Sequence, residues 1–370
     1  MRITAAAVNP ALLSDAPYVF ERQRLPHAVW HAEGGPGEIL ATLSNRWAPV
    51  LSRGSGPWTL HAFAPHPDAQ DSLTRAAQGL GAALRRALCE AGAGLTGRYV
   101  EPDAAARTSP AELSVLQLCR VPGGAWTALS PATDLSDPWP GGVHRMPDDP
   151  LAPSRSYSKI EEAFDVMGVA PKAGETAVDL GAAPGGWSWA FVKRGCHVVA
   201  VDNGPMQLKS LGDWGGELEH VKRDGMTFAP ARPVDWLASD MLVAPGPALG
   251  LVRKWHREGW ARRMVVNFKL PQQHPLAALD PVRAALDDLP GFRYRLRQLY
   301  HDRREVTLMA QCDAPPARGQ HAAGGRDRQA QPPARHGQPP SGRPQSGQPR
   351  PPRHGRPGRK LPRRKPQGRR

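Results

Sequence analysis

The sequence predicts an α/β protein whose main domain holds a doubly wound, mostly parallel sheet. Two observations lead to this fold class. Between residues 156 and 312, short apolar runs typical of strands alternate with amphipathic stretches typical of helices. The first of these strands runs directly into a glycine-rich turn, a common feature of ligand-binding sheets of this kind. Such alternation indicates a sheet that is covered by helices on both faces.

The elements of this domain follow one another at short intervals. The expected strands cover residues 176–180, 196–202, 218–223, 234–240, 264–269, 294–300 and 305–312. The expected helices lie near residues 187–194, 247–261 and 277–289. Ligands bind such sheets at the carboxyl ends of the strands, so the functional residues should stand just after them.

The residues before this domain predict a smaller α+β module. Alternating or helical spacing indicates a strand at 58–63, a helix at 72–89 and a strand pair at 114–120 and 126–129. Prolines and glycines cluster between residues 131 and 155, as in an interdomain connector. The expected domain limits are 1–55 for an N-terminal segment, 56–145 for the α+β module, 146–313 for the main domain and 314–370 for a tail.

The formal charge of +14 is confined to that tail. Residues 314–370 carry 15 Lys and Arg against one Asp, so the preceding residues are neutral overall. The tail has no aromatic residue and repeats Pro, Gly, Gln and Arg, a composition that buries too little apolar surface to fold. We expect a disordered basic arm that is attracted to nucleic-acid phosphates.

The spacing of the cysteines and the hydropathy of the chain indicate the cellular compartment. The four cysteines are widely spaced and form no Cys-x-x-Cys pair, which argues against a zinc ribbon or a disulfide scaffold. No apolar run is long enough for a signal peptide or a membrane helix. We therefore expect a cytoplasmic monomer with no membrane partner and no metal.

A ligand site is predicted where the first strand ends. Gly181, Gly185 and Gly186 remove the side chains that would block a ligand at the turn from strand to helix. Asp202 ends the second strand, where a carboxylate can accept ribose hydroxyls, and Asp224 follows the third, where one can meet an adenine amino group. A dinucleotide would need Gly-x-Gly-x-x-Gly, whereas this turn contains a proline. S-adenosylmethionine is therefore the better ligand.

Motifs along the main domain resemble a known family. The segment Asp179-Leu-Gly-Ala-Ala-Pro-Gly-Gly-Trp187 resembles the cofactor loop of the FtsJ-type RNA 2′-O-methyltransferases. A wider set of segments resembles, in order and spacing, the bacterial 23S rRNA (cytidine-2′-O)-methyltransferase M family more specifically. These segments are residues 152–156, 159–164, 201–206, 223–225, 268–271, 298–302 and 305–307. The resemblance implies a Rossmann-like S-adenosylmethionine-dependent methyltransferase domain behind a THUMP-like RNA-binding domain and a further N-terminal domain, which looks shortened in this chain.

The resemblance also implies the site residues. A Lys-Asp-Lys-Glu tetrad falls on Lys159, Asp240, Lys269 and Glu305. The expected cofactor-binding residues are Asp179, Gly181, Ala182, Pro184, Gly185, Gly186, Trp187, Asp202, Asp224 and Asp240.

The tetrad can also be interpreted chemically. Ser158 and Glu161 predict a capping box that would place Lys159 in the first turn of a helix. Asp240 and Lys269 end the fourth and fifth strands, so their side chains can meet at one edge of the sheet. A ribose 2′-hydroxyl needs both alignment and proton removal before it attacks a methyl group. Because a partly desolvated ammonium beside another cation loses its proton more easily, Lys269 is the candidate base or hydroxyl-orienting group.

The predicted reaction is S-adenosylmethionine-dependent 2′-O-ribose methylation of RNA, on a cytidine of 23S rRNA or its precursor. The segment 240–245 lacks the Asp/Asn-Pro-Pro-aromatic pattern of enzymes that methylate a base nitrogen. The sequence also lacks the Pro-Cys nucleophile of enzymes that methylate C5 of a pyrimidine, so both of these reactions are disfavoured. Two alternatives stay open, namely another rRNA nucleotide and a catalytically silent RNA-binding ribosome assembly factor. His301 and Asp302 either contact the substrate or order the turn before Glu305.

Overall fold

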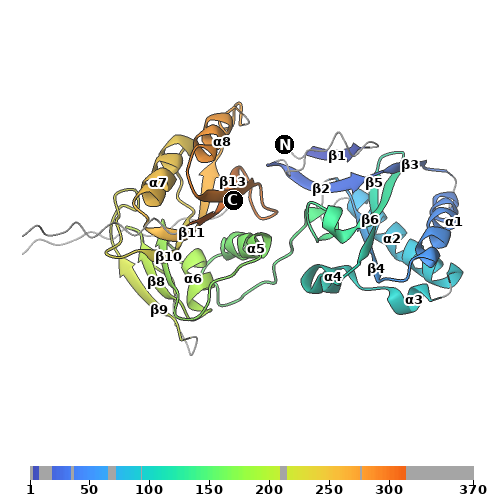
Figure 1. The fold of residues 1–370 in the computed structure, drawn as a ribbon, viewed down its shortest axis with the longest axis horizontal. Coiled ribbons are helices and arrows are strands. Elements are labelled where there is room, and N and C mark those ends of the chain that lie inside the picture. Colours follow the sequence, from blue (N-terminus) through green and yellow to red (C-terminus); the bar gives the residue numbers. More distant parts are fainter. Residues whose placement is uncertain are drawn as a thin grey trace, which may run out of the picture. The chain divides into compact units, whose positions relative to one another are not determined.

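The computed structural model describes residues 3–7, 19–34, 37–65, 72–92, 94–208, 215–275 and 277–313. The chain divides into two units, residues 1–318 and residues 319–370. The expected basic arm at 314–370 lies outside the described residues. Within the first unit, an N-terminal module precedes a main domain along the chain (Figure 1).

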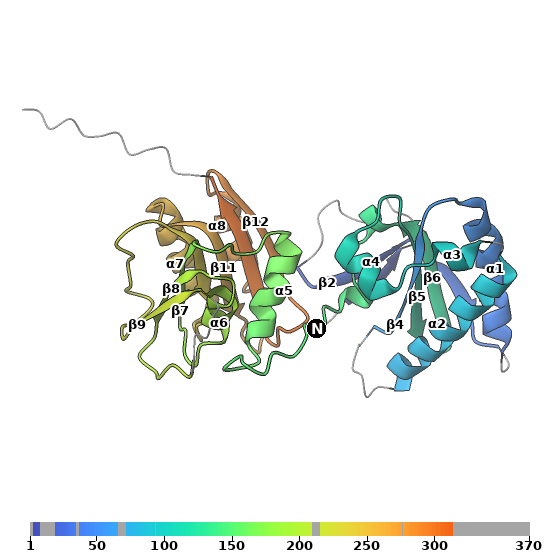
Figure 2. The ribbon, with the colours of Figure 1, turned by 90° about the horizontal axis from the view of Figure 1, so that it is seen from below.

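The N-terminal module is a small sheet covered by helices. Its elements are β1 (Ile3–Ala7), β2 (Glu21–Pro26), β3 (Val29–Ala32), α1 (Glu38–Arg53), β4 (Trp58–Phe63), α2 (Ser72–Ala91), α3 (Leu95–Arg98), α4 (Pro102–Thr108), β5 (Ser114–Val121) and β6 (Gly124–Pro131). Four strands pair in the order β3-β6-β5-β4, and β1 pairs with β2. Helices α1 and α2 pack side by side on the four-stranded sheet and share one apolar core with it (Figure 2). The strands expected at 58–63, 114–120 and 126–129 are confirmed.

The boundary expected at residue 55 does not separate two domains. Val29 of β3 pairs with Thr127 of β6, so a strand from the first 55 residues belongs to the four-stranded sheet. Leu43 and Trp47 of α1 lie in the same buried cluster as Leu116 of β5. The module therefore begins well before residue 56, because the edge strand β3 of its sheet and the covering helix α1 come from the preceding residues.

The main domain follows the proline-rich connector. Its elements are α5 (Tyr157–Met167), β7 (Thr176–Leu180), α6 (Gly186–Val192), β8 (His197–Val201), β9 (Glu217–Val221), β10 (Val234–Ser239), α7 (Pro245–Arg257), β11 (Ala261–Lys269), α8 (Asp280–Asp287), β12 (Phe292–Arg297) and β13 (Glu305–Cys312). In the described residues they form a seven-stranded sheet of order β12-β13-β11-β10-β7-β8-β9. All neighbours from β9 to β11 are parallel, whereas β13 runs antiparallel between β11 and β12.

This topology confirms the predicted fold class. Numbered from β7, the strands from β9 to β11 stand in the order 3-2-1-4-5, which is the Rossmann-like order. The chain reverses its direction across the sheet between β7 and β10, and ligands bind such folds at the carboxyl ends of the strands beside that reversal. The glycine-rich turn follows β7, so it stands at this position.

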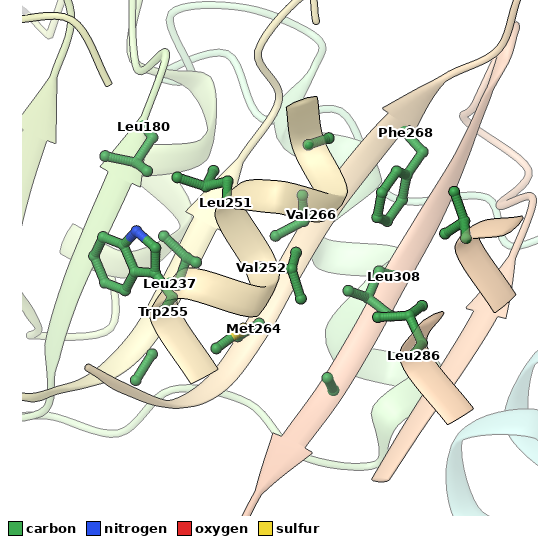
Figure 3. Close-up of a cluster of buried hydrophobic side chains, with 14 of the residues drawn as sticks. Leu180, Leu237, Leu251, Val252, Trp255, Met264, Val266, Phe268, Leu286 and Leu308 are labelled. Atoms are coloured by element: carbon green, nitrogen blue, oxygen red, sulfur yellow. The ribbon is translucent and has the colours of Figure 1, made fainter. Parts of the chain in front are cut away.

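Two apolar cores hold the sheet between its helices. On one face, Leu251, Val252 and Trp255 of α7 pack on Leu237 and Val266 of the sheet (Figure 3). On the other face, Phe164 of α5 and Phe191 of α6 pack against Trp236. Full burial of one such side chain stabilises the fold by about 1.5–3 kcal/mol. These central strands are buried on both faces, which explains their nearly continuous apolar sequence.

Candidate active site

The glycine turn has a backbone that only glycine adopts easily. Gly181 has a φ of 76° and Gly185 a φ of 115°. A Cβ on Gly181 would meet the side chain of Met241, and one on Gly185 would lie 3.0 Å from Cε of Met206. Both positions therefore exclude other residues through their conformation and through their neighbours.

Two carboxylates lie at the same edge of the sheet as this turn. Asp202 follows β8, and its Oδ2 accepts the backbone N–H of Ala183 at 3.1 Å while its Oδ1 accepts that of Gly204 at 2.6 Å. Asp224 stands beyond β9, is exposed and accepts the N–H of Met226 at 2.9 Å. Because β7, β8 and β9 are neighbouring parallel strands, the residues that follow them gather at one edge.

Other residues expected at the cofactor lie beneath the turn. Asp179 is 1% exposed, and its Oδ2 accepts the hydroxyl of Ser188 at 2.7 Å. Burial raises the pKa of this carboxyl to about 7. Trp187 is 3% exposed, and its Nε1 donates to the carbonyl oxygen of Ser156 at 3.0 Å. Ala182 and Gly186 are buried as well, whereas Pro184 is half-buried. Asp179 and Trp187 are thus buried next to the turn and stabilise it through these two hydrogen bonds.

Lys159 lies in the first turn of α5, but the predicted capping box is wrong. The helix begins at Tyr157, and its cap residue Ser156 makes no side-chain capping hydrogen bond. Glu161 instead pairs with Nζ of Lys193 at 2.6 Å and with Nη2 of Arg194 at 2.5 Å. The carboxylate that was expected to cap α5 is therefore paired with two cations that follow α6 in the chain.

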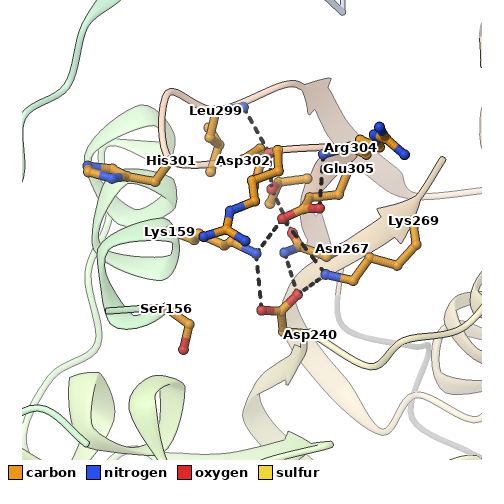
Figure 4. Close-up of polar contacts among 12 residues, drawn as sticks. Ser156, Lys159, Asp240, Asn267, Lys269, Leu299, His301, Asp302, Arg304 and Glu305 are labelled. Carbon is orange, nitrogen blue, oxygen red and sulfur yellow. Dashed lines mark hydrogen bonds and ion pairs between the residues drawn. The ribbon is translucent and has the colours of Figure 1, made fainter. Parts of the chain in front are cut away.

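The four residues of the expected tetrad meet at the carboxyl-end edge of the sheet (Figure 4). Nζ of Lys159 lies 3.3 Å from Oδ2 of Asp240 and also pairs with Oε1 of Glu305. Nζ of Lys269 pairs with Oδ1 of Asp240 and lies 3.9 Å from the same Oε1 of Glu305. Each carboxylate therefore faces both amines.

Both amines of the tetrad are largely buried. Burial alone would lower the pKa of Lys159, but Asp240 and Glu305 outweigh it and raise the pKa above its usual value. Lys159 therefore stays protonated at neutral pH. The side chain of Lys269 is 19% exposed and that of Lys159 is 13% exposed, so the carbon chains and amines of both lie mostly inside the protein.

Two buried neighbours of the tetrad were missed in the sequence. Nδ2 of Asn267 donates to Oδ1 of Asp240 at 2.8 Å, and the hydroxyl of Thr307 donates to Oδ1 of Asn267 at 2.7 Å. A signal was present, because each is a polar residue inside an apolar strand. Asn267 stands two residues before Lys269 and Thr307 two residues after Glu305, and period-two alternation puts such pairs on one face of a strand.

Similarity to known proteins decides the family. A family model described as FtsJ-like methyltransferase matches residues 152–242. The ribosomal RNA large subunit methyltransferase M of Xanthomonas campestris pv. campestris (strain B100) is 36% identical over 286 residues, which cover 72% of this chain and 76% of that protein. The chain belongs to the ribosomal RNA large subunit methyltransferase M family. The Laribacter hongkongensis protein of the same name is 46% identical over 184 residues, covering 46% of this chain and 51% of that protein.

Solved structures are more distant. The magnesium protoporphyrin IX methyltransferase of Synechocystis PCC 6803 has a TM-score of 0.33 and 20% identity, covering 43% of this chain and 79% of that chain. The 1,6-didemethyltoxoflavin-N1-methyltransferase of Burkholderia thailandensis has a TM-score of 0.30 and 15% identity, covering 44% and 78%. At this level of similarity, neither structure indicates which reaction this chain catalyses.

Membership in the M family confirms the predicted enzyme class, so the chain is a methyltransferase. The segment that matches the FtsJ-like model contains the glycine turn, Lys159 and Asp240, whereas Lys269 and Glu305 follow it. No described helix is long and apolar enough to cross a membrane.

Proposed function

We propose that this chain transfers a methyl group from S-adenosylmethionine to a ribose 2′-hydroxyl of 23S rRNA or its precursor, on a cytidine. The observation that carries the proposal is the tetrad, in which two lysines and two carboxylates contact one another beside the glycine turn. The M-family relatives act, by their name, on large-subunit ribosomal RNA. We expect the reaction to take place in the cytoplasm, with a monomeric enzyme.

The residues at the glycine turn fit the proposed methyl donor. Gly181 and Gly185 leave the turn without side chains, and Asp202 offers a half-buried carboxylate beside it for the ribose hydroxyls. Asp224 is exposed and free to accept the adenine amino group in addition to its backbone bond. When bound, S-adenosylmethionine supplies an electrophilic methyl group. Asp240 connects this turn with the tetrad, because it follows β10, the neighbour of β7.

The tetrad would orient the hydroxyl and receive its proton. We assign Lys269 this task because it directly precedes Leu270, which lines the cavity described next, and because a lysine amine in its neutral form can accept a proton, which an arginine cannot. Lys159 stays charged and keeps both carboxylates in place. Removal of a proton from a positioned hydroxyl contributes about 10²- to 10⁴-fold to a rate. The transfer needs no metal, because these side chains orient the hydroxyl and take up its proton.

A cavity beside the tetrad suits an RNA strand. It is lined by Phe20, Leu270, Pro271, Gln298, Arg303 and Arg304. Leu270 directly follows Lys269, Arg304 directly precedes Glu305, and the N–H of Leu270 donates to the carbonyl oxygen of Arg304 at 2.7 Å. Arg303 and Arg304 are exposed cations that can pair with phosphates, and Phe20 offers a ring for a base. We further propose that the N-terminal module is THUMP-like and helps to recruit the RNA.

Mapping of ribose methylation tests the proposed function. The purified chain is incubated with methyl-labelled S-adenosylmethionine and a 23S rRNA transcript, and rRNA from a deletion strain is mapped by mass spectrometry. We expect one 2′-O-methylcytidine to form in vitro and to be lost in the strain. Loss of a different methylated nucleotide would change the target. An unchanged map, together with no transfer in vitro, would instead support a silent assembly factor.

The basic arm at 314–370, which lies outside the described residues, is proposed to attract RNA without choosing the target. Deletion of the arm should weaken RNA binding, with the largest loss at low salt, because its 15 cations release counterions from phosphates. The methylated position should stay the same. A matched control keeps the length of the arm and replaces every Arg and Lys with Gln. A shifted methylation site in either variant would contradict this division of tasks.

A further inference from the structure

Asp302 is a buried acid beside the tetrad to which no role has been assigned. It lies in the turn between β12 and β13 and is 6% exposed. Glu162 of α5 holds this turn, because its carboxylate accepts the backbone N–H groups of Tyr300 at 2.6 Å and of His301 at 3.1 Å. Oδ2 of Asp302 accepts the N–H of Leu299 at 2.9 Å (Figure 4). The same oxygen lies 2.9 Å from the hydroxyl oxygen of Thr307.

Hydrogen-bond donors determine how Asn267 is oriented. Asp240 pairs with two lysines and is an ionised carboxylate, so it can only accept. The group of Asn267 that lies 2.8 Å from Asp240 must therefore be the amide nitrogen, which turns the amide oxygen toward Thr307. An amide oxygen can only accept, so the hydroxyl of Thr307 must donate to it.

This orientation leaves Thr307 without a hydrogen for Asp302. A hydroxyl has one hydrogen, and Thr307 gives it to Asn267 over 2.7 Å. The 2.9 Å contact between the Thr307 hydroxyl oxygen and Oδ2 of Asp302 is then a hydrogen bond only if Asp302 supplies the proton. A chain of donors thus runs from Asp302 through Thr307 and Asn267 to Asp240.

Burial supports a neutral Asp302 independently. Its Oδ1 is buried and has no hydrogen-bond partner among the described residues, which would be costly for a charged carboxylate. Burial is the main reason that the pKa of this carboxyl rises to about 8, and the nearby charge of Glu162 raises it further. The N–H of Leu299 and the charge of Lys159 oppose this rise without cancelling it. The charged groups that act most directly on Asp302 are Glu162 and Lys159 of α5. Glu305 of β13 pairs with that Lys159, and Arg22 of β2 donates to the carbonyl oxygen of Leu299.

We propose that Asp302 is a positioning residue that works as a neutral acid, donating to Thr307 so that Asn267 holds Asp240 in line with the two lysines. This inference rests on the proposed function of the tetrad. It assigns to the turn before Glu305 a task beyond ordering its own backbone. Ionisation of Asp302 would remove the proton that it donates to Thr307 and disturb the alignment of Asp240.

The pH dependence of kcat tests the role of Asp302. With a 23S rRNA transcript, wild-type kcat should contain a component that falls above about pH 8, as Asp302 loses its proton. Asp302→Asn keeps an N–H donor for Thr307 that does not titrate, although this amide nitrogen cannot accept from the N–H of Leu299. The pH-dependent component should therefore be absent, and kcat at pH 7 should fall less than in Asp302→Ala. Asp302→Ala and Thr307→Val should each lower kcat roughly fivefold to tenfold, the effect of one net hydrogen bond, with the KM for S-adenosylmethionine unchanged.

Controls separate this role from folding and from the proposed function. Asp235→Asn changes a carboxylate of β10 that accepts from Thr176 at the opposite end of the strand, and it should alter neither kcat nor its pH profile. Carboxyl ¹³C NMR of the chain without RNA should find Asp302 titrating near pH 8, whether or not ribose is the substrate. An ionised Asp302 at pH 6, or a wild-type pH profile in Asp302→Asn, would overturn the proposal. If Asp302 titrates as stated but ribose is not methylated, the proposed function fails instead.

Discussion

Replacement of Lys269 by alanine is expected to abolish methyl transfer while S-adenosylmethionine still binds. The change removes the amine that we assign to the substrate hydroxyl, so kcat should fall by about 10²- to 10⁴-fold. Binding of S-adenosylmethionine, measured by calorimetry, should change little, because the glycine turn and Asp202 belong to other strand ends. The fold should persist as well, because Asp240 keeps its contacts with Lys159 and Asn267.

Two further variants sharpen this result. Lys269→Arg keeps a positive charge beside Asp240 but cannot give up its proton at neutral pH, so it should be nearly as inactive as Lys269→Ala. Activity close to wild type in Lys269→Arg would leave Lys269 an electrostatic role only. Lys172→Ala is the matched control, because Lys172 is exposed and precedes β7 at the opposite edge of the sheet. Full activity in Lys269→Ala would refute the assignment.

Replacement of Asp137 by alanine is expected to destabilise the fold by about 3–5 kcal/mol, the usual cost of leaving a buried charge without its partner. Asp137 of the connector is 1% exposed and Arg297 of β12 is 4% exposed. Oδ2 of Asp137 lies 2.8 Å from Nη1 of Arg297, and Oδ1 also accepts the N–H of Trp139 at 2.9 Å. Urea unfolding followed by circular dichroism measures the loss.

A paired variant separates the ion pair from general packing. Arg297→Met combined with Asp137→Leu removes both charges and should recover most of the stability lost in Asp137→Ala, since an apolar pair of similar size is often neutral. A double variant as unstable as the single one would contradict this explanation.

The same contact predicts the effect of acid. Burial would raise the pKa of Asp137, but the hydrogen bond from His144 and the charge of Arg297 outweigh it and lower the pKa. A depressed carboxyl pKa stabilises the folded state above the unfolded pKa of about 3.9. The stabilisation should therefore be complete at neutral pH and lost as the pH falls through the lower folded value. Asp137→Ala should remove this part of the acid dependence.

Much of the main domain could be predicted because its signals are local. The strands at 176–180 and 305–312 begin and end where their apolar runs do. The helix expected from residue 277 begins instead at Asp280, with Pro281 in its first turn, where its missing N–H costs nothing. The strand expected from residue 264 begins at Ala261, because Ala261 and Arg263 already pair with Val234 and Trp236 of β10.

Predictions that depended on distant partners were less secure. The capping box at Ser158 had the right spacing, but Lys193 and Arg194 reach Glu161 from beyond α6. The boundary expected at residue 55 left β3 out of the module. The pairing of Val29 with Thr127 is not visible in the local composition of either segment. Neither contact could be inferred from spacing, since each joins residues that are far apart in the chain.

The sequence by itself determined the alternating strands and helices, the glycine turn and the chemical types of the tetrad. These follow from side-chain periodicity and from backbone conformations that only glycine permits. Tertiary structure alone decided that both lysines contact both carboxylates, that Asp179 is buried and that Thr307 and Asn267 link Asp302 to Asp240. The physical reason is that charge, burial and the direction of a proton depend on neighbours that meet only when parallel strands bring their ends together.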